Sequence, residues 1–229
     1  MCTNYTPATP PALGGLAVLG GAPLPPQAWP PETFPGYPAP IVFRGASGAP
    51  VCELARFGLM PRWSRDARQG TELSRRTCNA RSETVAEKPS FRSPWREQRY
   101  ALAPMLDFFE PCWESGRAVR WRITAAGGMP FAVAALHETW IDPDTGELAR
   151  SFTLLTVNAD GHPLMGRMHR PGDEKRMLVV LDPADHQRWL QASPAEAAGL
   201  MQRTGPGVLT GEPAPLPSQG PSPQQALAF

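Results

Sequence analysis

The chain has 229 residues, 41% of them hydrophobic, and a formal net charge of +1 at pH 7. This length suits one domain with one sizeable core, and the near-neutral charge excludes a protein that seeks polyanions through bulk charge alone. Of the 22 basic residues 20 are arginine, and residues 56–99 hold eleven basic against five acidic side chains. Because arginine's planar fork suits phosphate, this segment is a candidate track for nucleic acid, with a solvated surface as the alternative.

In chain order, the first segment to stand out is residues 5–40, which hold eleven prolines and Glu32 as the only charge. We predict extended or turning coil there, in the form of a wrapping arm or loop. From Thr204 onward the chain has six prolines and no basic residue. We therefore expect a domain covering residues 1–203 and a disordered or loosely attached tail over residues 204–229.

Between these ends the pattern is mostly that of strands. Seven short apolar or alternating runs are bounded by Gly, Pro, Asp or Asn, as strands are. They cover residues 41–43, 51–57, 100–110, 118–123, 131–136, 152–157 and 177–181. Residues 143–146, Pro-Asp-Thr-Gly, are typical of a turn between two of them.

Helical patterns are fewer. Residues 82–88 and 183–191 are candidates, and Ser193 is a plausible N-cap for residues 194–203, with Glu196 completing a capping box. The sequence therefore predicts an α+β fold: a single domain with a β-barrel-like or antiparallel sheet core and peripheral helices.

The four cysteines, at positions 2, 52, 78 and 112, have no Cys-x-x-Cys spacing, which argues against a zinc knuckle and favours reduced thiols. We predict no metal, and no nucleotide cofactor because the glycine pairs lie in proline-rich coil. No apolar window approaches the roughly 20 residues of a membrane span, so we expect a soluble, cytoplasmic protein without a membrane partner.

Cys2 is the most informative residue, because removal of Met1 would put a thiol and a free α-amine on one carbon. The amine titrates at about 7.7–8.0 and the thiol near about 8.5, so both are partly available at neutral pH. An aldehyde can form an imine with the amine, and the thiol can then close a thiazolidine on the same carbon. A cysteine in this position is more often incidental, so its assignment depends on partners elsewhere.

Four pieces of the sequence line up with Cys2. They are Cys-Asn-Ala-Arg-Ser-Glu-Thr at 78–84, Phe-Phe-Glu-Pro-Cys-Trp at 108–113, Thr-Leu-Leu-Thr at 153–156, and Met-His at 168–169 followed by Arg-Met at 176–177. In this order the chain resembles the SOS response-associated peptidase (SRAP) family, whose members carry an N-terminal Met-Cys and similar motifs. The resemblance covers roughly residues 1–190, and residues 79–84 are its most specific part.

The resemblance implies a mixed α/β fold around a β-barrel-like core. It also implies covalent capture of abasic sites in single-stranded DNA, within the SOS and DNA-repair response, and peptidase and lyase-like activities, the first removing Met1. A ring-opened abasic deoxyribose is an aldehyde, which is the electrophile that Cys2 requires. We accordingly expect single-stranded DNA with abasic sites as the partner, a monomer, and association with the nucleoid when DNA is bound.

The catalytic roles implied by the resemblance fall on four residues. Cys2 resembles the nucleophile, Asn79 the residue that positions the amine and the sugar, and Glu110 the carboxylate that holds or deprotonates the amine. His169 resembles the general acid that opens the sugar ring, a step suited to histidine near neutral pH. A turn-stabilising role is the alternative for Asn79.

Two further residues compete for these roles. Glu114 rivals Glu110 but has more polar neighbours, and His162, seven residues upstream, rivals His169.

For DNA binding, the resemblance marks Arg81 as a phosphate or sugar clamp and Trp63 as a stacking or wedging residue. Thr156 is assigned a hydroxyl contact to phosphate, and Arg176 is also assigned to the DNA surface. For Trp63 and Thr156, packing in the core is an equal alternative.

The chain departs from the family pattern in three places. Thr3 and Asn4 stand where the family often continues Gly-Arg, so an arginine near the nucleophile is absent. Residues 170–175 lengthen the loop after His169, and the end of the chain lacks the usual basic stretch. Two other functions stay open: an N-terminal-nucleophile amidohydrolase using Cys2, and a non-covalent single-strand binder with a decayed site.

Overall fold

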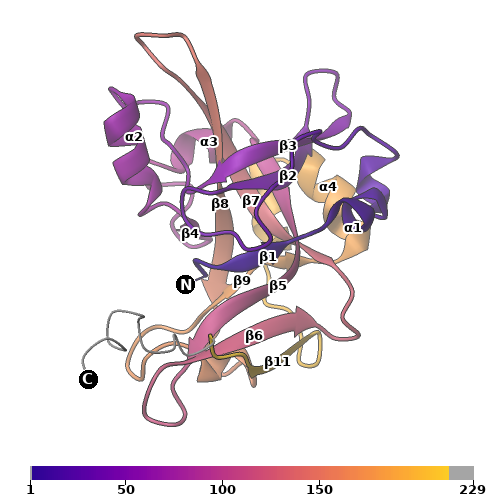
Figure 1. Ribbon diagram of the computed structural model, residues 1–229, viewed down its shortest axis with the longest axis vertical. Coiled ribbons are helices and arrows are strands. Elements are labelled where there is room, and N and C mark those ends of the chain that lie inside the picture. Colours follow the sequence, from indigo (N-terminus) through magenta and orange to yellow (C-terminus); the bar gives the residue numbers. More distant parts are fainter. Residues whose placement is uncertain (1, 217–229) are drawn as a thin grey trace, which may run out of the picture.

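The computed structural model describes residues 2–216, and its core is a closed barrel of five strands (Figure 1). Around the barrel the order is β7–β8–β3–β2–β5, and β5 pairs back to β7. The strands are β2 (Pro38–Arg44), β3 (Pro50–Phe57), β5 (Tyr100–Cys112), β7 (Phe131–Ile141) and β8 (Leu148–Asn158). Each contains one of the predicted strands, so the α+β class with a barrel-like core is confirmed.

Shorter strands extend this sheet beyond the barrel. The second half of β5 leaves the ring and pairs with β1 on one side and β6 on the other, while β6 pairs onward with β11. Strands β4 and β9 both pair with β8, and β10 pairs with β7. They are β1 (Tyr5–Pro7), β4 (Asn79–Arg81), β6 (Val119–Ala125), β9 (Arg176–Leu178), β10 (Val180–Leu181) and β11 (Leu209–Pro213).

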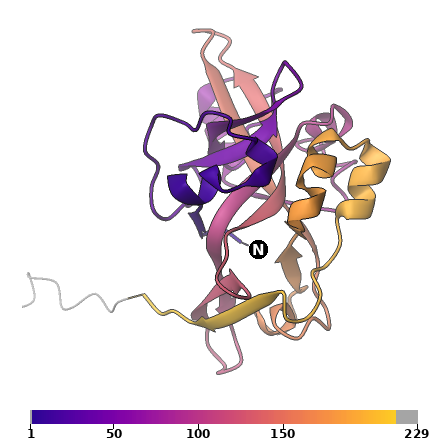
Figure 2. The ribbon, with the colours of Figure 1, turned by 90° about the vertical axis from the view of Figure 1, so that its right-hand side faces the viewer.

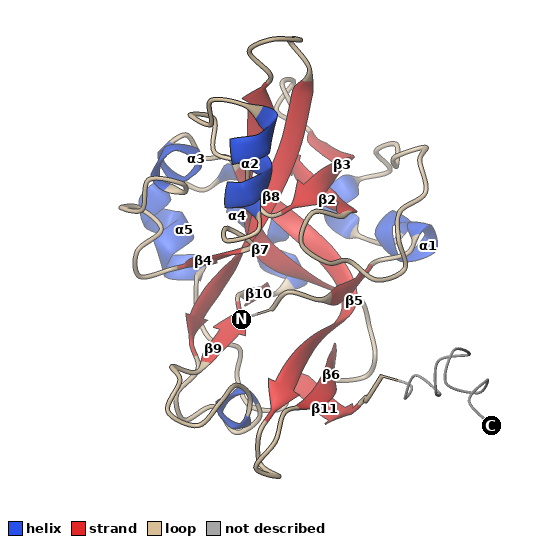
Figure 3. Ribbon diagram, turned by 60° about the vertical axis from the view of Figure 1, so that its left-hand side comes forward, coloured by secondary structure: helices blue, strands red, loops and turns tan. Residues whose placement is uncertain are grey.

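Helices lie around the barrel, as Figure 3 shows. They are α1 (Pro10–Gly14), α2 (Ala67–Ser74), α3 (Arg92–Arg96), α4 (His186–Gln191) and α5 (Pro194–Leu200), with short 3₁₀ turns at Ala17–Leu19, Met165–Arg167 and Pro183–Asp185. Figure 2 shows α4 and α5 side by side along the barrel. The indole of Trp189 in α4 donates to the carbonyl of Ala101 in β5 at 2.8 Å, which fixes the helix to the sheet.

Two predicted helices are confirmed, and one is wrong. Residues 183–191 form a 3₁₀ turn followed by α4, and Ser193 caps α5 in a capping box with Glu196. Residues 82–88 form successive turns instead of a helix. The start of this segment is hydrogen-bonded to β8, because the amide of Ser82 donates to the carbonyl of Thr156 at 2.9 Å.

Within the described residues, the segments 5–40 and 204–216 contain more regular structure than the sequence predicts. Within residues 5–40, Tyr5–Pro7 forms β1 and Pro10–Gly14 forms α1, so a simple coil is wrong for this segment. Within the predicted tail, Leu209–Pro213 pairs with β6, while residues 217–229 lie outside the described residues. No helix in residues 2–216 has the length and apolar character needed to cross a bilayer.

Candidate active site and nucleic-acid surface

The N-terminal segment reaches the site by adding a strand to β5. Tyr5 is fully buried and pairs with Phe108, and the amide of Phe109 donates to the carbonyl of Asn4 at 2.9 Å. Strand pairing fixes the path of a backbone because each hydrogen bond sets the register of the next residues. Cys2 is thereby delivered to the part of β5 that carries Glu110.

The thiol of Cys2 is buried, with 1% of the residue exposed, and its Sγ lies 3.5 Å from the carbonyl oxygen of Asn4. Burial raises the pKa of this thiol well above its ordinary value, and the nearby charge of Glu110 raises it further. At neutral pH the resting sulfur is therefore a protonated thiol. Its attack on any electrophile requires a group that accepts the proton.

Asn79 links the middle of the chain to Cys2. Strand β4 runs parallel to β8, with Asn79 opposite Leu154, and the Asn79 amide Nδ2 donates to the carbonyl of Cys2 at 2.7 Å. Among the described residues nothing donates to Asn79 Oδ1, although that oxygen is buried. The side chain therefore holds the Cys2 backbone with one atom and presents an acceptor with the other.

Glu110 and His169 form a buried pair. Only 3% and 8% of these residues are exposed, and His169 Nε2 lies 3.0 Å from Glu110 Oε2. The backbone of His169 is tied to the same strand, because its amide donates to the carbonyl of Pro111 at 2.8 Å. At this separation a proton can pass between the imidazole and the carboxylate.

Lys175 explains how the lengthened loop still brings His169 to Glu110. Its Nζ donates to three successive carbonyl oxygens, those of Met168, His169 and Arg170, at 2.8, 3.1 and 3.0 Å. His169 itself has a φ of 64°, in the left-handed region that non-glycine residues rarely adopt. One ammonium group that binds three carbonyls stabilises this unusual backbone, and nothing in the sequence pattern indicated it.

The two competing residues have other roles. His162 Nδ1 accepts hydrogen bonds from the amides of Leu164 and Met165, so its ring stabilises a turn, and burial lowers its pKa. Glu114 is exposed and forms a two-point ion pair with Arg167. Glu110, by contrast, is the carboxylate whose charge acts on the Cys2 thiol.

The four residues assigned to DNA differ in exposure. The guanidinium of Arg81 is half exposed and pairs with Glu174 at 2.8 Å, whereas Thr156 and Arg176 are 1% and 2% exposed. Arg176 binds Glu83, Glu174 and the backbone and hydroxyl oxygens of Thr156. The structure thus gives Thr156 and Arg176 partners within the protein, and Arg176 shares the carboxylate of Glu174 with the exposed Arg81.

Trp63 projects from a loop that is fixed on both sides. It is 49% exposed, and its indole donates to the carbonyl of Pro89 at 3.4 Å. On one side Arg62 forms ion pairs with Glu138 and Glu97, and on the other the indole of Trp140 donates to the carbonyl of Ser64 at 2.9 Å. A large aromatic face is therefore held in a defined position at the surface.

An arginine from another strand binds the start of the chain. Arg120 of β6 donates to the side-chain oxygen of Asn4 at 2.8 Å and to Glu32 at 2.9 Å. Its guanidinium also lies over the ring of Phe109, 3.3 Å from the ring centre. Arg120 and Glu32 therefore anchor the start of the chain, a role that the sequence alone did not reveal.

A sequence profile described as SOS response associated peptidase (SRAP) matches residues 25–210. The abasic site processing protein YoqW of Bacillus subtilis is 32% identical over 138 residues, covering 59% of this chain and 55% of YoqW. The abasic site processing protein HMCES of Xenopus tropicalis is 25% identical over 158 residues, covering 61% and 45%. The chain thus spans about half the length of these curated relatives.

Among solved structures, a Bordetella bronchiseptica protein superposes with a TM-score of 0.85 at 29% identity, covering 94% of this chain and all of that one. A Bacteroides thetaiotaomicron protein superposes with a TM-score of 0.73 at 22% identity, covering 92% and 90%, and thus shares the fold.

Proposed function

Since this chain belongs to the SOS response-associated peptidase family, we propose that it captures abasic sites in single-stranded DNA as a covalent adduct of Cys2, once Met1 has been removed. The observation that carries the proposal is the meeting of four segments distant in sequence. Asn79 holds the Cys2 backbone at 2.7 Å, and Glu110, beside the Cys2 thiol, pairs with His169 at 3.0 Å. YoqW and HMCES, both named as abasic site processing proteins, support the same reaction class.

The first step is proton donation to the sugar. An abasic deoxyribose is mostly a closed hemiacetal. His169 protonates its ring oxygen as the bond from that oxygen to C1 breaks, and the C1 hydroxyl loses its proton to the now neutral imidazole, which leaves the aldehyde. The paired carboxylate of Glu110 stabilises the imidazolium before and after this exchange. Asn79 Oδ1, which lacks a donor among the described residues, can accept from the Cys2 amine or from a sugar hydroxyl.

Covalent capture follows in two bond-forming steps. The Cys2 amine adds to the aldehyde carbon, and loss of one water leaves an imine. The thiol then adds to that carbon while its proton passes through Glu110 to the imine nitrogen, closing the thiazolidine. Because burial keeps the thiol protonated, the amine reacts first and the carboxylate is needed for the second step.

For DNA contact we propose that Arg81 binds a phosphate and that Trp63 stacks on a base next to the lesion. Stacking on a fixed aromatic face tolerates any base, as a lesion binder requires. Thr156 and Arg176 support this surface from below, because both Arg81 and Arg176 bind Glu174. Met1 leaves by hydrolysis of its peptide bond, which we assign to the protein's own site.

The proposal is tested with purified protein and single-stranded DNA that carries one abasic site. We expect a heat-stable shift on a denaturing gel for wild type, no shift for Cys2→Ala, and no shift for protein whose N-terminus is blocked by a retained extension. The matched control is Cys52→Ala, because Cys52 is also a buried free cysteine but lies on β3 outside the site. No adduct with wild type, or an adduct that survives Cys2→Ala, contradicts the proposal.

A further inference from the structure

Helix α2 stands at the edge of the barrel (Figure 1). Arg68 within it and Arg75 and Arg76 directly after it form a basic face, here called the α2 face. Together with the residue pair that follows it, the helix borders a surface hollow of about 640 Å³. The hollow is lined by Ala67, Arg68, Thr71, Glu72, Arg75 and Arg76. Three guanidinium groups against one carboxylate give this hollow a positive charge, which suits an anionic ligand.

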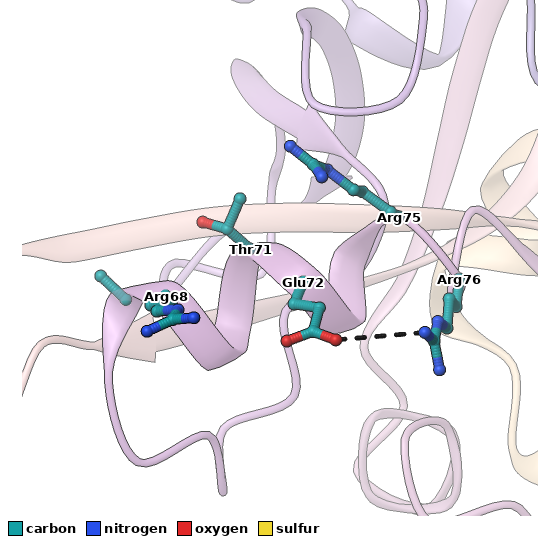
Figure 4. A pocket seen from close by; sticks show the side chains of 6 residues that line it. Arg68, Thr71, Glu72, Arg75 and Arg76 are labelled. Atoms are coloured by element: carbon teal, nitrogen blue, oxygen red, sulfur yellow. Dashed lines mark ion pairs between the residues drawn. The ribbon is translucent and has the colours of Figure 1, made fainter.

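Within the hollow, the single carboxylate neutralises little of that charge. Figure 4 shows Arg68, Glu72 and Arg76 along one side, as expected for residues four apart. Glu72 lies 4.0 Å from Arg76, and their side chains are 67% and 80% exposed. An ion pair this long and this exposed is weak and screened by salt, so it yields readily to a phosphate.

A second groove connects this hollow to the candidate active site. It measures about 290 Å³ and is lined by Arg76, Thr77, Asn79, Arg81, Thr84, Lys88, Pro89, Ser90 and Phe91. No acidic residue is among these nine lining residues, and Arg76 lines both hollows. Two of its lining residues lead to the proposed site, because Asn79 binds the Cys2 backbone and the carbonyl of Pro89 accepts from Trp63.

The helix is held firmly enough to present these groups. The side chain of Asp66 caps it by accepting from the amide of Gln69 at 2.7 Å. Gly70 lies against the core, where an added Cβ would come within 2.5 Å of the Met60 side chain. The basic face is therefore fixed relative to the loop that carries Trp63.

We propose that one flank of the bound single strand leaves Cys2 along the Asn79–Arg81 groove, and that Arg76 and then Arg68 of the α2 face bind its phosphates. This path rests on the proposed function, because it takes Cys2 as the position of the abasic residue. Arginine forks bind phosphate oxygens through two hydrogen bonds, so successive guanidiniums order a flexible strand. The α2 face then adds affinity for DNA that extends beyond the lesion on one side only.

The test compares two oligonucleotides that each carry one abasic residue near one end. In the first, about eight nucleotides lie on the 5′ side of the abasic residue, and in the second they lie on its 3′ side. Affinity is measured by fluorescence anisotropy in the Cys2→Ala background, so that binding is separated from covalent capture. We expect the double variant R68Q/R76Q to bind one oligonucleotide about tenfold more weakly, and to lower the slope of log affinity against log salt by about 1.4, because two phosphate contacts are lost. Glutamine keeps a good helix propensity, so α2 is preserved.

Three matched variants complete the design. R44Q/R188Q removes two exposed arginines on β2 and α4 and should leave both affinities unchanged. R68K/R76K should retain most of the salt slope, and E72Q should bind the same oligonucleotide more tightly. An unchanged affinity for R68Q/R76Q, or an equal loss with both oligonucleotides, overturns the path. Absence of a covalent adduct with wild type overturns the proposed function instead.

Discussion

At the scale of single residues, Asn79 gives the sharpest test of how Cys2 is held. Asn79→Ala removes the 2.7 Å hydrogen bond to the Cys2 carbonyl and the buried acceptor Oδ1. We expect the rate of adduct formation at saturating DNA to fall at least tenfold, while the free energy of unfolding drops by only about 1 kcal/mol, the usual net value of one hydrogen bond. Single-turnover gel assays and urea denaturation measure the two effects.

The control for Asn79 is Asn158→Ala, which changes another partly buried asparagine, at the end of β8, whose side chain is hydrogen-bonded to Asp160 and not to Cys2. It should lower stability without slowing capture. Equal rates for Asn79→Ala and wild type would mean that the amide has only a structural role.

Glu110 offers a second residue-scale prediction, concerning the order of the two bonds. Burial and the charge of Glu110 hold the pKa of the Cys2 thiol above its ordinary value, so the thiol must lose its proton during ring closure. Glu110→Gln removes the acceptor for that proton. Because Glu110 also assists ring opening in the proposed mechanism, we expect both species to decline, but the heat-stable adduct to decline more than the imine trapped by borohydride reduction. An equal decline of both species would confine Glu110 to the steps before imine formation.

The sequence and the structure differ in what they reveal about single residues. Cys2, Asn79, Glu110 and His169 were predicted from short motifs that resemble those of a family, and the structure brings these four residues close together. Lys175 and Arg120 were not, since their roles come from contacts that only the folded chain creates. The burial of Cys2 and Glu110 also depends on the whole fold, so no short motif predicts it.

At the scale of elements, the loop over residues 170–175 carries two residues with separate contacts, Lys175 to the backbone around His169 and Glu174 to Arg81. Lys175 stabilises the left-handed backbone at His169 through three carbonyls. Lys175→Met keeps the length of the side chain but removes the donors, so His169 should lose its position beside Glu110.

For Lys175→Met we expect slower capture and a shifted pH dependence of the rate at saturating DNA, with DNA affinity nearly unchanged. Lys175→Arg, which retains the donors, should recover part of the rate. A wild-type pH profile in Lys175→Met would rule out a positioning role.

Glu174 in the same loop restrains Arg81. Its carboxylate binds Arg81 at 2.8 Å and Arg176 at 2.7 Å, but Arg176 also keeps Glu83 as a two-point partner. Glu174→Gln should therefore free Arg81 without unfolding the loop, and the affinity for single-stranded DNA should rise about threefold, since freeing one exposed ion pair is worth up to about 1 kcal/mol. Anisotropy titration measures the gain, and Glu114→Gln, which breaks the exposed pair with Arg167, is the control.

Elements were predicted well wherever burial leaves a pattern in the sequence. The barrel strands are long and apolar, and the capping box at Ser193 is a local signal. Strands β1 and β4 have only three residues each, and their pairing with β5 and β8 depends on partners far along the chain. Helix α2 was missed because it faces solvent and contains Gly70, whose place against Met60 no local pattern predicts.

At the scale of the whole molecule, closure of the barrel gives the site its rigidity. The first half of strand β5 is part of the barrel, and its second half carries Glu110. The position of Glu110 is therefore fixed by the same strand that helps to close the barrel. Strand β8 pairs with β7 in the barrel and also carries β4 and β9, which bring in Asn79 and Arg176. We therefore expect the rate of abasic-site capture to depend on the free energy of unfolding only under conditions in which the barrel strands separate.

The acid stability of the whole fold should depend on His137 of β7. This histidine is buried against the ring of Phe43, and burial, reinforced by the charges of Arg150 and Arg99, lowers its pKa from 6.5 to about 3. Between these two values the unfolded chain binds a proton that the folded chain does not, so stability falls as pH drops below 6.5. His186 and His162 act in the same direction, because burial lowers their pKa values too.

His137→Gln should therefore flatten the pH dependence of the free energy of unfolding. Glutamine stays neutral and can still accept from Arg150, which approaches His137 Nδ1 at 3.4 Å. Between pH 6 and 5, urea denaturation should show a slope smaller by about 1 kcal/mol per pH unit, the contribution of one proton. A variant that keeps the wild-type slope, while its stability at pH 8 is lowered or unchanged, would mean that the folded chain can protonate His137 without cost.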